Sequence, residues 1–227
     1  MTVPEWYTGT DRSGRVSRGI EQVIERMDAH EADHDDVERI DELLAIEEEP
    51  NWRAFLSGLA GTIHYDLEDI ETAHEVLERS LAGYKTYLDT FDGVLSVYCQ
   101  SCYTMGVIHY DAGRFTDAVP WFLRCLPYMH EVYDEVYVGN IYSFLSACLS
   151  GIGRSEEGLI MAEAANFTRK SDCESLEQLM VSYGSTGDIA RATEVFHVLE
   201  EHCRDHDDFD RVRAYAREQL GEGGEVN

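Results

Sequence analysis

Cysteine and histidine are the side chains of this sequence that could hold a metal ion or take part in redox chemistry. The six cysteines include one Cys-x-x-Cys pair, Cys99 and Cys102, and the nine histidines include His202 and His206, which are one helical turn apart. A structural zinc site needs a second pair of ligands at a suitable spacing, and the sequence has no second Cys-x-x-Cys. We therefore interpret Cys99 and Cys102 as buried neighbours on one helix face.

The location of the protein decides how the cysteines are interpreted. The first residues, MTVPEWYTGTDRSG, do not show the basic segment followed by an apolar one that marks a signal peptide, so we expect a cytoplasmic protein. Thiols stay reduced in that compartment. We therefore expect no disulfide framework among the cysteines at positions 99, 102, 125, 148, 173 and 203.

Two of the histidines, His64 and His109, occupy the same place in a repeated segment. A shared metal site or a pH switch is one interpretation, and packing between two helices is the one we favour. His202 and His206 stand beside aspartates and could hold a divalent ion. Acidic residues are abundant throughout this chain, so that pattern is not specific. We predict no metal and no cofactor.

Sequence motifs of catalysis are missing. There is no phosphate-binding loop, no GxGxxG, no GxSxG and no HExxH. We therefore predict that the protein is not an enzyme.

The charge of the chain excludes several kinds of partner. There are 45 acidic residues against 18 basic ones, a formal net charge of -27, and the only lysines are Lys85 and Lys170. Nucleic acids and anionic membranes are bound through Lys and Arg, so we expect neither as a partner. Many acidic residues with few lysines resemble the proteins of salt-in halophilic microbes. Molar salt would screen the repulsion, and we expect a high-salt cytoplasm.

An internal repeat is the strongest structural signal. Residues 61–81 align without gaps on residues 106–126, and eight of the 21 positions are identical, where chance would give about one or two. The shared residues are glycine, isoleucine, His-Tyr-Asp, alanine, arginine and leucine in both segments.

The second segment resembles the tetratricopeptide repeat (TPR) family. In that family a first helix carries a small residue and then an aromatic one, and a second helix opens on an alanine after a tight turn. These places are taken by Gly106, Tyr110, the turn at Gly113, Ala118 and Phe122. Small residues let the two helices approach closely. Weaker units follow around turns at Gly153 and Gly187.

The resemblance implies an all-α fold, a right-handed superhelical array of antiparallel helix hairpins. This TPR-like α-solenoid has an extra N-terminal hairpin and a C-terminal capping helix. We expect a single domain over 15–220, between a flexible segment at 1–14 and a disordered tail at 221–227. Apolar spacing and turns predict hairpins at about 15–47, 51–90, 94–132, 136–170 and 173–203, and a cap helix at about 206–220.

In a TPR array the first helix of each hairpin lines a concave surface. The resemblance therefore implies a partner-binding groove that includes Phe55, Tyr65, Asp66, Gln100, Tyr103, Val107, Tyr110, Asp111, Asn140 and Ser143. This wall is aromatic and weakly polar, and tyrosine is common at interfaces. The alternative is that Tyr65 and Tyr110 only pack against the neighbouring repeat. TPR domains that hold chaperone C-termini carry Lys, Arg and Asn at these positions, and only Asn140 is of that type here.

Three functions follow as hypotheses. The first is a scaffold or regulatory adaptor that binds a segment of another protein in the groove. The second is a structural repeat protein that associates with copies of itself. The third is a metal-binding or small-molecule-binding protein that uses the histidines.

Overall fold

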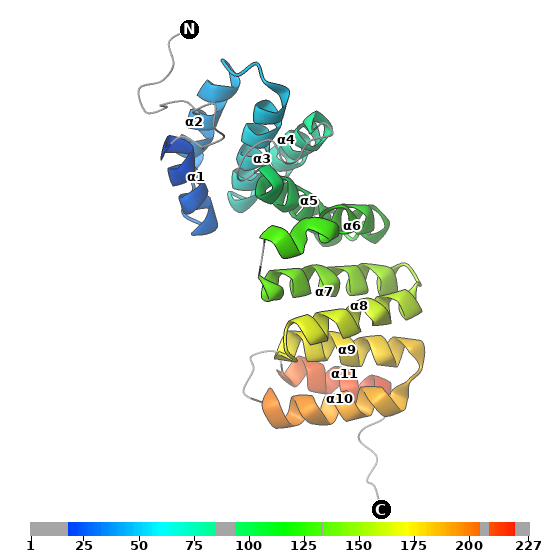
Figure 1. Ribbon diagram of the computed structural model, residues 1–227. Helices are drawn as coiled ribbons and strands as arrows, with labels where there is room; N and C mark the ends of the chain where they lie inside the picture. The colour runs from blue at the N-terminus through cyan, green and yellow to red at the C-terminus, as the bar shows by residue number, and fades with distance from the viewer. Residues whose placement is uncertain (1–17, 85–93, 133, 205–208, 221–227) are drawn as a thin grey trace, which may run out of the picture. The chain divides into compact units, whose positions relative to one another are not determined.

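Every helix or strand that the structure describes is an α-helix, which confirms the predicted all-α class. The computed structural model describes residues 18–84, 94–132, 134–204 and 209–220 (Figure 1). The flexible segment predicted at 1–14 and the tail predicted at 221–227 lie outside the described residues.

The helices follow one another as hairpins along the chain. They are α1 (Arg18–Asp28), α2 (His34–Leu44), α3 (Pro50–Asp66), α4 (Ile70–Gly83), α5 (Val94–Asp111), α6 (Phe115–Val132), α7 (Glu135–Gly151), α8 (Ser155–Thr168), α9 (Cys173–Thr186), α10 (Ile189–His202) and α11 (Phe209–Leu220). Within a hairpin the two helices pack on each other, as α3 does on α4, α7 on α8 and α9 on α10.

Acidic residues begin many of these helices. Each of them accepts a hydrogen bond from a backbone N–H of the first turn, which would otherwise have no partner. The caps are Asp33, Glu49, Asp69, Asp134, Asp172 and Asp188. A negative charge at a helix N-terminus is also favoured by the helix dipole. Part of the acidic excess therefore stabilises the helices.

The turns inside the hairpins need a left-handed backbone. Gly113, Gly153 and Gly187 have φ angles of 70°, 81° and 83° there. Glycine adopts this region without the steric cost that a Cβ imposes. The first repeat has Glu68 at the corresponding place, with φ 63°. The glycine turns predicted from the sequence are thus present, and the first repeat makes the same turn with a less suitable residue.

The chain forms two compact units. The first is made of residues 1–112 and 123–132, and the second of residues 113–122 and 133–227. The single domain expected over 15–220 stays a prediction.

In the first unit, α3 packs against α2, α4 and α5. Its core joins apolar residues of the N-terminal hairpin to those of α3, including Ile20, Ile40, Leu43, Phe55 and Leu59. A Cβ on Gly61 of α3 would lie 2.6 Å from the Cγ of Leu77 of α4. The repeated glycine therefore allows the two helices to approach closely, as the alignment predicted.

An ion-pair cluster joins the first two helices of this unit. Asp36, with 0% of its surface exposed, forms ion pairs with Arg26 at 3.0 Å and with Arg39 at 3.1 Å. A buried carboxylate is tolerated because two guanidinium groups compensate it. Removing either arginine would leave that charge undercompensated.

The second unit stacks α7, α8, α9 and α10 as antiparallel pairs, and α11 packs on α9 and α10 (Figure 1). Its core includes Met180, Phe196, Leu199, Phe209 and Val212. None of the helices among the described residues is both long enough and apolar enough to cross a membrane.

Candidate binding surface

The first unit brings together the ends of two neighbouring first helices. Tyr65 and Asp66 lie in the last turn of α3, and Tyr110 and Asp111 lie in the last turn of α5, which packs beside α3. Asp111 is exposed and the other three are half-buried. Burial raises the pKa of Tyr65, and the negative charges of Asp111 and Asp66 raise it further. The phenol of Tyr65 therefore lies near carboxylates of both helices.

Asp66 has a further neighbour. Burial raises its pKa, while His30, whose Nδ1 lies 3.5 Å from the Asp66 carboxylate, opposes that effect. A partly desolvated carboxylate attracts a cationic or hydrogen-bond-donating group. This end of the first unit therefore suits a partner that carries such groups.

Four more predicted groove residues belong to this unit, and they differ in accessibility. Gln100 and Tyr103 are half-buried on α5, whereas Val107 is only 8% exposed. Phe55 is 0% exposed, and its ring packs edge-on against that of Trp52, with 5.2 Å between the ring centroids. The prediction that Phe55 lines the groove is therefore wrong. The N-terminal hairpin packs on that half of α3 and makes Phe55 a core residue.

The last two predicted groove residues, Asn140 and Ser143, lie on α7 of the second unit. The Asn140 side chain is half-buried and has no hydrogen-bond partner among the described residues. The Ser143 hydroxyl is buried, also without a partner there. They form a separate small polar surface of the second unit.

The repeated histidines have different surroundings. His64 lies with its Nδ1 3.5 Å from Asp69, and that nitrogen makes no hydrogen bond in the described part of the chain. His109 meets His74 edge-on, with 5.5 Å between the ring centroids. No group of three or more His, Cys, Asp or Glu side chains that could hold a metal occurs among the described residues. Position 206 of the His202 and His206 pair lies outside them.

The Cys-x-x-Cys pair is buried in the first unit. Cys99 and Cys102 are both 0% exposed, and the Cys99 thiol faces the carbonyl of Cys125 at 4.0 Å. Burial raises the pKa of Cys99 and of Cys102 to about 12, and it also raises the pKa of Cys125. Because the thiolate is the reactive form, these thiols are inert at neutral pH. The interpretation of the pair as buried neighbours is confirmed.

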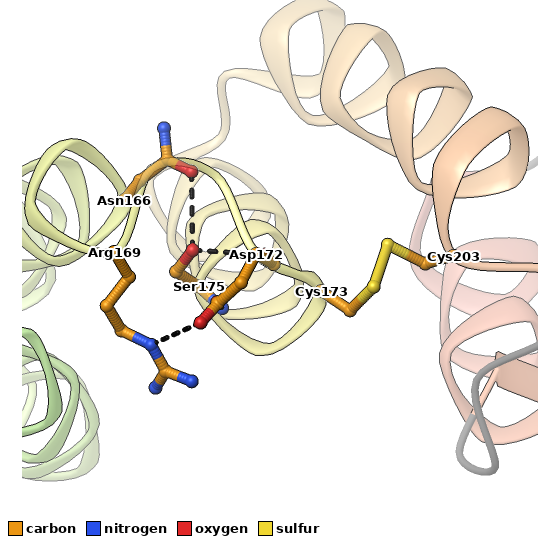
Figure 2. Close-up of a disulfide and its surroundings, with 6 residues drawn as sticks. All are labelled: Asn166, Arg169, Asp172, Cys173, Ser175 and Cys203. Carbon is orange, nitrogen blue, oxygen red and sulfur yellow. Dashed lines mark hydrogen bonds and ion pairs between the residues drawn. A yellow bond between two sulfur atoms is a disulfide. The ribbon is translucent and has the colours of Figure 1, made fainter. Parts of the chain in front are cut away.

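One disulfide is present, contrary to the expectation that there is none. Cys173 is bonded to Cys203, with 5.7 Å between their Cα atoms (Figure 2), a separation typical of disulfides. Cys173 is the first residue of α9, and Cys203 is the C-cap of α10. The bond thus closes the open end of this hairpin, opposite the turn at Gly187.

Polar side chains hold the beginning of α9 beside the disulfide (Figure 2). Asp172 caps the helix by accepting from the Ser175 amide at 2.9 Å, and it accepts from Arg169 at 2.7 Å. The Ser175 hydroxyl lies 3.5 Å from Asn166. Cys173 is therefore placed by a network that joins the end of α8 to the start of α9.

The disulfide could have been predicted from topology. In an antiparallel hairpin, the first residue of one helix and the last of the next lie at the same end. The predicted hairpin at about 173–203 had a cysteine at each limit. A reducing cytoplasm would keep the same two thiols unbonded.

Comparisons with known proteins agree on the fold. No protein-family model and no curated protein matches the sequence. Among solved structures, YrrB, a TPR protein with an unusual peptide-binding site, superposes with a TM-score of 0.63 and 14% identity, covering 88% of this chain and 87% of YrrB. MamA from AMB-1 superposes with a TM-score of 0.59 and 16% identity, and the match covers 80% of this chain and 94% of MamA. A putative kinesin light chain of Podosopora anserina with nearly identical TPR-like repeats superposes with a TM-score of 0.56 and 15% identity. The match covers 89% of this chain and 94% of the kinesin light chain structure. The chain therefore has a TPR-like helical repeat fold.

Proposed function

We propose that this protein is a non-enzymatic scaffold or regulatory adaptor that binds a segment of another protein on the first helices of its repeats. The supporting observation is the surface at the ends of α3 and α5, where Tyr65 and Tyr110 stand beside Asp66 and Asp111. Tyrosine contributes a large contact area and a hydroxyl at low entropic cost. YrrB, which shares the fold, is described as having a peptide-binding site.

The partner that fits this surface is a segment with basic or hydrogen-bond-donating side chains. Asp66 and Asp111 supply the negative charge, and Tyr65, Tyr103 and Tyr110 supply faces on which an Arg or Lys chain packs. Neither a nucleic acid nor a membrane suits this charge.

The experiment that tests this proposal is site-specific photo-crosslinking. A photoreactive phenylalanine at position 103 would link the partner, and mass spectrometry would identify the segment. The dissociation constant of that synthetic segment would then be measured for the wild type and for a Tyr65→Ala, Tyr103→Ala, Tyr110→Ala variant. We expect binding to weaken at least about thirtyfold, because one hot-spot tyrosine costs about 2 kcal/mol or more when it is truncated. Tyr128→Ala, on α6, is the matched control, and equal affinity of the triple variant and the wild type would reject the surface.

Self-association is the second candidate function, and one observation favours it. Ile160 and Phe167 lie seven residues apart on α8 and are 60% and 87% exposed. Residues at that spacing share one helix face, and exposed apolar faces often mark contacts. Sedimentation equilibrium in high salt tests this function. An Ile160→Ser, Phe167→Ser variant should be a monomer if the wild type is an oligomer, and a monomeric wild type would exclude it.

A high-salt cytoplasm is a separate part of the proposal. It rests on the net charge of -27, whose self-repulsion molar salt would screen. The Cys173–Cys203 disulfide argues the other way, because disulfides persist mainly in oxidising compartments. Melting temperatures in dilute and molar KCl test the salt dependence, and equal values would contradict it.

A further inference from the structure

A pocket of the first unit lies where three helices meet, away from the carboxylates at the ends of α3 and α5. It has a volume of about 500 Å³ and is lined by the end of α2, the first turns of α3 and the last turns of α4. Its apolar and small lining residues are Leu44, Ala45, Pro50, Ala54 and Gly83. A pocket of this size accommodates a small organic molecule.

Two arginines line this pocket, Arg53 of α3 and Arg79 of α4. No described carboxylate lies within ion-pair distance of either of them, although acidic residues outnumber basic ones 45 to 18. Asp41 also lines the pocket, and it pairs with neither arginine. Elsewhere in the described chain, carboxylates do pair with Arg26, Arg39, Arg154, Arg169, Arg191 and Arg211. The pocket therefore has two exposed guanidinium groups that form no ion pair with a described carboxylate.

Arg53 is held in place by the chain itself. One of its terminal nitrogens donates to the carbonyl oxygens of Leu44, at 2.5 Å, and Glu47, at 2.7 Å. The guanidinium is thereby fixed at the pocket while its remaining N–H groups have no described partner. A positioned donor loses less entropy when it binds a ligand.

Ser57 supplies a third polar group. Its side chain is 7% exposed, lines the pocket and makes no hydrogen bond to any described residue. The hydroxyl is therefore free to donate a hydrogen bond to a ligand oxygen. Two guanidiniums without a described carboxylate partner, an unpaired hydroxyl and apolar walls together describe a site for an anion with an apolar body.

We infer that this pocket binds the carboxylate of a small apolar acid, with Arg53 and Arg79 on the carboxylate and Leu44, Ala54 and Pro50 around the hydrocarbon. A phosphate fits less well, because the apolar lining suits a hydrocarbon body and the backbone N–H groups of the helix start, which often bind phosphate, are partly used here. At the start of α3 the Glu49 carboxylate already accepts from the Trp52 amide, at 2.7 Å. The ligand carboxylate could belong to a free acid or to the last residue of a peptide.

The test is calorimetric titration of the full chain with 4-methylpentanoate, at one KCl concentration that keeps the protein folded. We expect saturable binding of the acid and none of its neutral amide, 4-methylpentanamide. Arg79→Gln should weaken binding about tenfold or more, because charge-assisted hydrogen bonds are the strong ones. Arg79 has no described partner, so this variant should keep the wild-type melting temperature. Ser57→Ala should weaken binding less, and Arg213→Gln, on α11, should not change it.

Three results would overturn the inference. They are equal binding of acid and amide, wild-type affinity in Arg79→Gln, and absence of saturable binding to the wild type. If inorganic phosphate binds through Arg79 and the acid does not, the inference of a carboxylic acid is wrong and the ligand of the pocket is a phosphate. A peptide ending in leucine, compared with its C-terminal amide, distinguishes the two sources. Tighter binding of the free-carboxylate peptide than of 4-methylpentanoate supports the site and identifies a chain terminus as its ligand.

Discussion

The cysteines around α5 and α6 and those around α9 and α10 have opposite chemistry. Cys99 and Cys102 form the motif that suggests a metal or a redox pair, yet both are buried free thiols. Cys173 and Cys203 form no motif, since 30 positions separate them, and they are bonded. The difference teaches that placement decides the fate of a cysteine. Two thiols on the same face of one helix become packing groups, whereas two at the open end of a hairpin can bond.

The largest effect that would test this contrast is reduction of the disulfide. A bond across 30 residues restricts the unfolded chain and contributes about 3.5 kcal/mol by the loop-entropy estimate. We expect a reducing agent to lower the midpoint of urea unfolding for the wild type and to leave a Cys173→Ser, Cys203→Ser variant unchanged. Equal midpoints for the oxidised and reduced wild type would remove the structural role of this bond.

A second test substitutes one cysteine from each group under reducing conditions. Cys102→Ser should cost about 2 kcal/mol, because it buries a hydroxyl at a site with 0% exposure. Cys173→Ser should cost less than about 0.5 kcal/mol, because that side chain is half-buried at a helix end. Chemical denaturation measures both. Similar costs at the two positions would show that burial does not separate the groups.

Of the two groups of cysteines, alkaline pH should act on the buried thiols and not on the bonded pair. The pKa values of Cys99 and Cys102 are about 12 in the folded protein, above the ordinary value of about 8.5 in the unfolded chain. Their contribution to stability is thus complete below about pH 8.5 and is lost as the pH rises towards 12. The loss is about 1.4 kcal/mol per thiol for each pH unit within that window.

Urea unfolding at several alkaline pH values measures this dependence. A Cys99→Ala, Cys102→Ala variant provides the comparison, and it should lose less stability than the wild type over the same window. The two bonded cysteines have no proton to lose. A variant with the wild-type pH dependence would contradict the assigned cause.

The smallest expected effect on stability concerns the turns after α5 and after α9, where the two regions should behave alike. Gly113 follows α5 and Gly187 follows α9, both have a left-handed backbone, and neither has an atom within 4 Å of an added Cβ. Gly113→Ala and Gly187→Ala should therefore each cost about 1 kcal/mol, from backbone strain alone. Glu68→Gly, at the corresponding turn of the first repeat, should stabilise by a similar amount. Thermal melts of the three variants measure these changes, and unequal costs for the two alanines would reveal a contact beyond the backbone.

The helices and their turns could be predicted because the repeat fixes them locally. Gly61, Gly113 and Gly187 each need a small side chain or a left-handed backbone, and such requirements are visible in the sequence. The burial of Phe55 could not be predicted from the TPR repeat pattern, because that pattern does not include the N-terminal hairpin that covers Phe55. The disulfide contradicts the expectation of a reducing compartment, whereas the positions of Cys173 and Cys203 at the two limits of one hairpin do indicate it.

The candidate surface was predictable only in part. The repeat alignment placed Tyr65 and Tyr110 at equivalent positions, and the packing of α3 beside α5 brings Tyr65 near Asp111. The pocket with Arg53 and Arg79 gave no sequence signal. Those arginines are 26 positions apart, and the contact of α3 with α4 and the unpaired state of both guanidiniums appear only in three dimensions.

The bond between Cys173 and Cys203 also has a mechanical consequence. A force that pulls the chain by its two ends passes through the sulfur atoms and bypasses the 30 residues' worth of backbone between them. At full extension that backbone would add roughly 100 Å to the end-to-end length of the chain. The oxidised molecule is therefore a shorter tether than the reduced one, and its last hairpin stays a closed loop under load.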